Sequence, residues 1–133
     1  MFLLALTAGL PVALAGEDRT YDPIGHETTA AMQQILIDNG KCVNRNDCNV
    51  KQYVFFASSS SGLSFSVYGV TEREIVAPLV GVLSTQAQKL PIGTKLVAQF
   101  IRITKEADLE RGLFSSAPVF VEISVAGGYD NRR

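Results

Sequence analysis

The chain has 133 residues, with 12 Lys and Arg against 13 Asp and Glu, so its formal net charge is −1. This near-neutral balance argues against ligands recognised mainly by charge, and we expect neither nucleic acid nor an anionic membrane surface as a partner. The length suits one small domain with a single hydrophobic core.

The N-terminal segment MFLLALTAGLPVALAGED has the pattern of a secretory signal. Residues 2–15 carry no charged side chain, and Ala13 and Ala15 are the small residues that a signal peptidase recognises. The apolar run is shorter than the roughly 20 residues that cross a bilayer. We predict a periplasmic or secreted protein with no membrane span after signal cleavage, divided into a signal peptide (1–15), a flexible segment (16–21), a single domain (22–126) and a tail (127–133).

A first helix is predicted to begin at Asp22 and Pro23, because Asp can cap a helix and Pro is tolerated at its first position. Asn39 and Gly40 predict its end, since Gly readily adopts the left-handed conformation that closes a helix. Between them, apolar and small residues recur at helical spacing, namely Ile24, Thr28, Ala31, Met32, Ile35 and Leu36.

The two cysteines of the chain, Cys42 and Cys48, enclose a short polar segment. Structural zinc sites usually need four Cys or His ligands, and a redox pair is normally spaced C-x-x-C. Export to an oxidising compartment therefore favours a disulfide over free thiols or metal binding. Its short loop predicts a rigid polar knob over 44–47, which is either only a stiffened connection or a contact surface.

A β-hairpin is predicted after the cysteines. Residues 50–57 are rich in β-branched and aromatic side chains, and residues 63–68 alternate between apolar and polar. The serine-rich turn at 58–62 is most simply a solvated hairpin tip.

The second half of the chain repeats the order of one helix and two strands. Thr71 and Glu74 have capping-box spacing at the start of a helix that ends before Pro91, and Pro78 should kink or divide it. A long central strand over 94–104, a helical turn over 106–112 and a last strand over 119–125 follow. In this last strand Val119, Val121, Ile123 and Val125 are predicted to face the core.

These elements predict an α+β fold. The order α-β-β-α-β-β suits a two-layer domain with a mainly antiparallel four-stranded sheet and two helices packed on one face. The order alone does not say how the strands are arranged in the sheet.

Catalytic signatures are few. His26 and Glu27 begin an H-E-x-x pattern, but position 30 is Ala, where a zinc protease needs a second His. Carboxylates that could serve a small hydrolase are Glu72 and Glu74, which also suit a helix N-terminus, and Glu106, Asp108 and Glu110. We predict no enzyme activity, no cofactor and no metal site.

The sequence therefore favours a small exported protein that binds or inhibits a protein partner in the bacterial envelope, for example an immunity protein. A structural or assembly module of an envelope machine is the alternative, and a carboxylate hydrolase is a weaker one. The candidate contact surfaces are an exposed edge strand, which can accept a partner's strand, and two loops. The loop residues singled out are Asn44, Arg45, Asn46, Asp47, Ser59 and Ser60.

Overall fold

The computed structural model of the chain describes residues 19–112 and 118–130. The predicted signal peptide, residues 16–18 of the predicted flexible segment and residues 131–133 lie outside these ranges. The elements in chain order are α1 (Asp22–Asp38), α2 (Arg45–Lys51), β2 (Val54–Ser59), β3 (Gly62–Tyr68), α3 (Arg73–Ala87), β4 (Lys95–Ile101), α4 (Lys105–Arg111) and β5 (Val119–Ala126).

Helix α1 confirms the first predicted helix, with one change at its start. Its N-cap residue is Tyr21 and not Asp22, and Pro23 lies in the first turn, where a missing N–H costs no helical hydrogen bond. At the other end Gly40 adopts a φ of 77°, the left-handed conformation expected of a residue that closes a helix.

Helix α2 was not predicted, and it replaces the start of the first predicted strand. Its first turn covers the cysteine segment, which was expected to be a loop. Val50 and Lys51 complete the helix, and strand pairing begins only at Val54. The β propensity of 50–53 is outweighed by a capped helix start and by the i,i+4 ion pair between Asp47 and Lys51 (3.3 Å).

Helix α3 begins later than its sequence pattern suggested. Its N-cap is Glu72, with no hydrogen bond from a capping side chain, so the predicted Thr71–Glu74 capping box is absent. The Glu72 carboxylate instead accepts the N–H of Thr71 at 3.2 Å. The helix continues through Pro78 and is not divided there; Pro78 lies on the exposed side of the helix, where water can bond the carbonyl left without its N–H partner.

The four strands form one sheet in the order β2-β3-β4-β5. The two hairpins β2–β3 and β4–β5 are antiparallel, whereas β3 and β4 pair in parallel. The sheet is therefore mixed, and the prediction of a mainly antiparallel sheet was wrong. The reason is α3: a helix that connects two neighbouring strands returns the chain to the same end of the sheet, so the strands run in the same direction.

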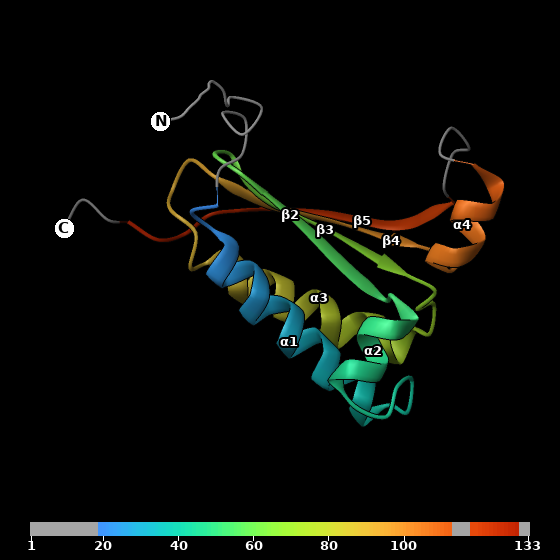
Figure 1. Cartoon of the computed structure of the whole chain (residues 1–133). Helices are drawn as coiled ribbons and strands as arrows, with labels where there is room; N and C mark the ends of the chain where they lie inside the picture. Colours follow the sequence, from blue (N-terminus) through green and yellow to red (C-terminus); the bar gives the residue numbers. More distant parts are fainter. Residues whose placement is uncertain (1–18, 113–117, 131–133) are drawn as a thin grey trace, which may run out of the picture.

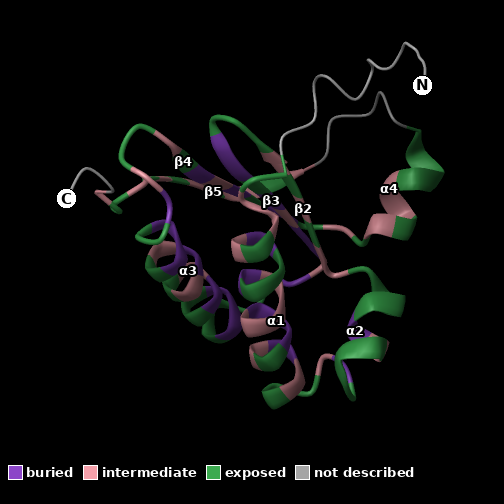
Figure 2. Ribbon diagram, turned by 60° about the vertical axis from the view of Figure 1, so that its left-hand side comes forward, coloured by how far each residue is buried: buried purple, intermediate pink, exposed green. Residues whose placement is uncertain are grey.

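Helices α1 and α3 lie side by side on the same side of the sheet (Figure 1). Apolar side chains of both helices and of the central strands fill the space between, and the helix surfaces turned towards the sheet are buried (Figure 2). The two helices run antiparallel, because Glu27 near the start of α1 pairs with Lys89 beyond the end of α3 (2.7 Å), and Lys41 beyond the end of α1 pairs with Glu72 (3.0 Å).

Strand β5 departs from the predicted alternation at its first residues. Val121, Ile123 and Val125 pack partly buried against the core, as predicted. Val119 does not, and it is 39% exposed. The register between β4 and β5 shifts at this end of the ladder, which turns Val119 to the other face and brings the Phe120 ring towards the core.

Candidate partner-binding site

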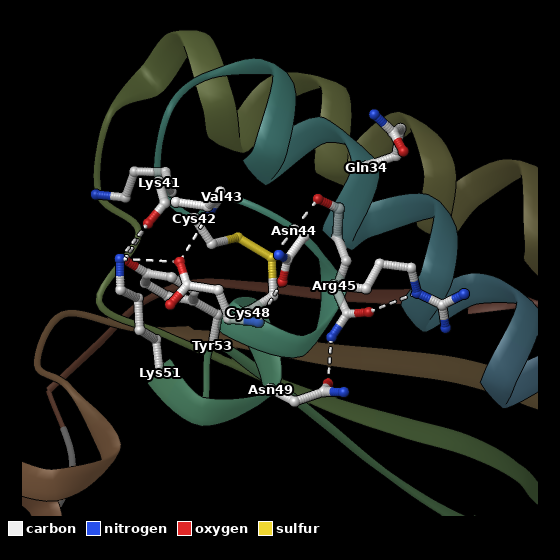
Figure 3. Close-up of a disulfide and its surroundings, with 12 residues drawn as sticks. Gln34, Lys41, Cys42, Val43, Asn44, Arg45, Cys48, Asn49, Lys51 and Tyr53 are labelled. Carbon is white, nitrogen blue, oxygen red and sulfur yellow. Dashed lines mark hydrogen bonds and ion pairs between the residues drawn. A yellow bond between two sulfur atoms is a disulfide. The ribbon is translucent and has the colours of Figure 1, made fainter.

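The predicted disulfide between Cys42 and Cys48 is present, and both side chains are buried (Figure 3). The segment between them was expected to be a loop and is instead the start of α2, but residues 44–46 are exposed and polar, as predicted for 44–47. The Asn44 side chain accepts the N–H of Asp47 at 2.9 Å, and Asp47 accepts the N–H of Val43 at 2.8 Å. This backbone hydrogen bond from Val43 lowers the pKa of Asp47.

A buried glutamine, which the sequence reasoning did not single out, holds α2 against α1. Gln33 donates to the Asn49 side chain at 2.6 Å and accepts from Arg45 Nε at 3.2 Å. Its only signal in the sequence is its place one residue after Met32, at the side of the predicted apolar stripe. The resulting surface around α2 is rigid and polar, with Asn46 exposed.

Ser59 and Ser60 lie at the tip of the β2–β3 hairpin, and both are exposed. Strand β2 begins next to α2 and ends at this tip, so its full length separates the two predicted contact loops (Figure 1). A cavity of about 370 Å³ opens beside the tip, lined mainly by serines and by Lys95. The structure does not bring the tip and the α2 segment into one surface.

The candidate hydrolase residues are also dispersed. The exposed His26 contacts the edge of the Phe56 ring, with ring centroids 5.1 Å apart. Glu72 lies at the opposite end of the helical layer, because α1 and α3 run antiparallel, and its pKa is lowered by hydrogen bonds from its own N–H and then from Lys41. Glu106 and Asp108 belong to α4, beyond β4. Across the described ranges, no three His, Cys, Asp or Glu side chains group to hold a metal ion.

The sheet has two edges, and α1 covers the side of β2 that faces the core. Phe56 lies so close to Gly25 of α1 that a Cβ atom at this glycine would collide with the ring. His26 contacts the same ring. Helix α1 therefore packs directly on the core-facing side of β2.

The edge formed by β5 is less covered. Within the described chain, α3 is the only helix with substantial contacts to β5, and it contacts β4 more extensively. Val121, Ile123 and Val125, which face the core, are only partly buried. The strand carries a single charged residue, Glu122, and no proline between Val119 and Ala126. Charges and prolines are common means of preventing strand addition at an edge.

The backbone of β5 offers hydrogen-bonding groups on its outer side. Gly127 donates its N–H to the Thr94 carbonyl at 2.8 Å. Hydrogen-bonded and non-bonded pairs alternate along an antiparallel ladder, so Val125, Ile123 and Val121 bond to β4. The N–H and C=O groups of the intervening residues therefore point away from β4, and no described strand pairs with them; these residues are Glu122, Ser124 and Ala126.

The outward groups of β2 are arranged in the same way. Tyr68 donates its N–H to the Tyr53 carbonyl at 2.8 Å, so the alternation directs the backbone groups of Val54 and Phe56 away from β3. The two edges are thus equivalent in their backbone. They differ in what lies over their core-facing side chains.

No protein-family model, curated protein or solved structure matches this chain. None of the helices in the described ranges is long and apolar enough to cross a membrane.

Proposed function

We propose that the chain is an exported protein that binds, and can thereby inhibit, a protein partner of the bacterial envelope, as an immunity protein does. The observation that carries this proposal is the outer edge of β5. It combines backbone groups that no described strand pairs with, partly buried apolar side chains and little charge. An extended segment of a partner can add to such an edge, with main-chain hydrogen bonds giving affinity and alternate side chains giving specificity.

Export is supported by the disulfide, because such bonds persist in oxidising compartments and are rare where thiols are kept reduced. A small domain also gains stability from a covalent link that restricts its unfolded chain. The apolar leader predicted from residues 1–15 is consistent with the same location.

The alternative, a structural or assembly module of an envelope machine, would use the same edge. It differs in the partner: an assembly module associates with itself or with a stable complex, whereas an inhibitor binds one target. The order Val121, Ile123, Val125 along β5 is the same in both directions, which favours a contribution from self-association.

A pull-down from the native envelope fraction tests the proposal. The tagged protein should recover a protein partner in near-equal amount, and Ser124→Pro should abolish recovery because it removes an outward N–H. Ser124→Ala, which keeps that N–H, should bind normally.

Two further variants test the other surfaces. Asn46→Ala at α2 and Ser60→Ala at the hairpin tip should leave recovery unchanged, because neither touches β5. Recovery that survives Ser124→Pro but fails in either of these variants would move the site away from β5. Recovery of no protein at all would refute the binding role.

A further inference from the structure

The outer edge of β5 is complementary to itself. Its core-facing residues read Val121, Ile123 and Val125, which is the same order of side chains in both directions. Two copies of the strand placed antiparallel can therefore match apolar side chains of similar size along their whole contact. Palindromic patterns of this kind suit a two-fold interface, in which the same patch serves both subunits.

The register of such a pair is restricted by the backbone. The outward groups of one copy must face outward groups of the other, which permits a two-fold axis at Ile123 or at Ser124. An axis at Glu122 would place two carboxylates directly opposite each other, which is destabilising. The choice is therefore between Ile123 and Ser124.

The side chains favour the axis at Ile123. Val121 then lies opposite Val125 of the second copy, and Glu122 lies opposite Ser124. With the axis at Ser124, Val121 would instead face Gly127, which has no side chain. The first register therefore buries more apolar surface.

We propose that the protein forms a two-fold dimer in which β5 pairs antiparallel with β5 of a second copy about Ile123. This inference rests on the proposed role of β5 as the docking edge and names a second copy as an occupant of that edge. A two-fold axis perpendicular to the sheet leaves both helical layers on one side of a continuous sheet. The assembly closes as a dimer because a two-fold interface uses the same patch of both copies.

Cysteine cross-linking of the full chain tests the register. In the proposed dimer the two Ile123 residues form a non-hydrogen-bonded pair with Cα atoms about 4.5 Å apart, which suits a disulfide. Ile123→Cys should give a covalent dimer on a non-reducing gel. Ser124→Cys, whose copies lie in different pairs, should give much less. Stronger cross-linking through Ser124→Cys would overturn the proposed register.

Sedimentation of the protein without added cysteines tests the dimer itself. Its mass should rise from monomer to dimer with concentration, and Ser124→Pro should weaken dimerisation at least about tenfold, because it removes one N–H from each copy. Ser124→Ala should dimerise normally. A protein that stays monomeric throughout would overturn the inference.

The same variants separate this inference from the proposed function. A monomeric protein that still recovers an envelope partner, and loses it in Ser124→Pro, retains the proposed function without the dimer. A monomeric protein whose recovery of a partner is unaffected by Ser124→Pro contradicts the dimer and the placement of the binding site at β5, while a monomeric protein that recovers no partner contradicts both the dimer and the proposed function.

Discussion

The two edges of the sheet have similar backbones but different surroundings. On the β2 edge, α1 lies so close that only a glycine at position 25 leaves room for Phe56. The core-facing residues are partly buried on both edges, but α3 contacts β5 less extensively than α1 contacts β2. In our proposal, the placement of the helices, and not the strands' own hydrogen-bonding groups, makes β5 the docking edge.

The largest expected effect comes from the disulfide, which lies far from β5. Replacing both Cys42 and Cys48 by Ala should lower the free energy of unfolding by about 2.4 kcal/mol, the chain-entropy estimate for a loop of about 7 residues. Urea denaturation measures this loss. The fraction that remains folded should still pair through β5, and a loss of pairing in the folded protein would mean that the two regions are coupled.

The next largest effect tests the cover on β2. Gly25→Ala should destabilise the fold by about 2 kcal/mol, because the added methyl group collides with the Phe56 ring and forces α1 away from β2. Gly81→Ala is the matched control: this exposed α3 glycine has no neighbour near the added methyl, so the change should stabilise by about 0.5–1 kcal/mol. Thermal or urea unfolding measures the change in unfolding free energy for both variants. Equal effects of the two changes would show that α1 does not pack tightly on β2.

A smaller effect is expected from charge changes at β5, and it tests the register of the proposed dimer. In the proposed dimer Ser124 lies opposite Glu122, so Ser124→Lys should strengthen dimerisation and Ser124→Glu should weaken it, each by up to about 1 kcal/mol. Added salt should reduce both effects. The control is Ala57→Lys and Ala57→Glu, which change an exposed position on β2. Sedimentation should find no effect of these two variants, and a matching response at Ala57 would contradict the distinction between the edges.

The smallest effect concerns acid sensitivity at the α2 end. Hydrogen bonding from the Val43 N–H lowers the pKa of Asp47 in the folded state. Its stabilising contribution is therefore complete above the unfolded pKa of about 3.9 and is lost as the pH falls through the folded pKa. Below a pH of about 3.9, the urea midpoint of unfolding should therefore depend less steeply on pH in Asp47→Asn than in the unchanged protein. An unchanged pH profile would show that the Asp47–Val43 hydrogen bond contributes little.

Local sequence patterns predicted much of the fold. The stripe containing Met32 and Leu36 placed α1, and the alternation of Leu63, Phe65 and Val67 placed β3. Helix α2 was missed because residues 50–53, which include the end of this helix, have a composition that favours a strand. The Asn44-x-x-Asp47 spacing, which joins a capping residue to an acid in the first turn, was the available signal.

The order of the strands and the exposure of the sheet edges could not be predicted from local sequence patterns. The parallel pairing of β3 and β4 depends on where α3 returns the chain, and the cover on β2 depends on how α1 crosses the sheet. Both are long-range outcomes that no window of neighbouring residues specifies. For this reason the sequence could name two loops and an exposed edge strand as candidate surfaces, but it could not say which edge strand.

Amide hydrogen exchange, read residue by residue by NMR, compares the two edges most directly. When β5 is saturated, by a second copy or by an envelope partner, the amides of Glu122 and Ser124 should exchange at least about tenfold more slowly than in the free monomer. The amides of Val54 and Phe56, which point outward from β2, should keep their exchange rates. Slower exchange along β2 with no change along β5 would contradict the assignment of β5 as the docking edge.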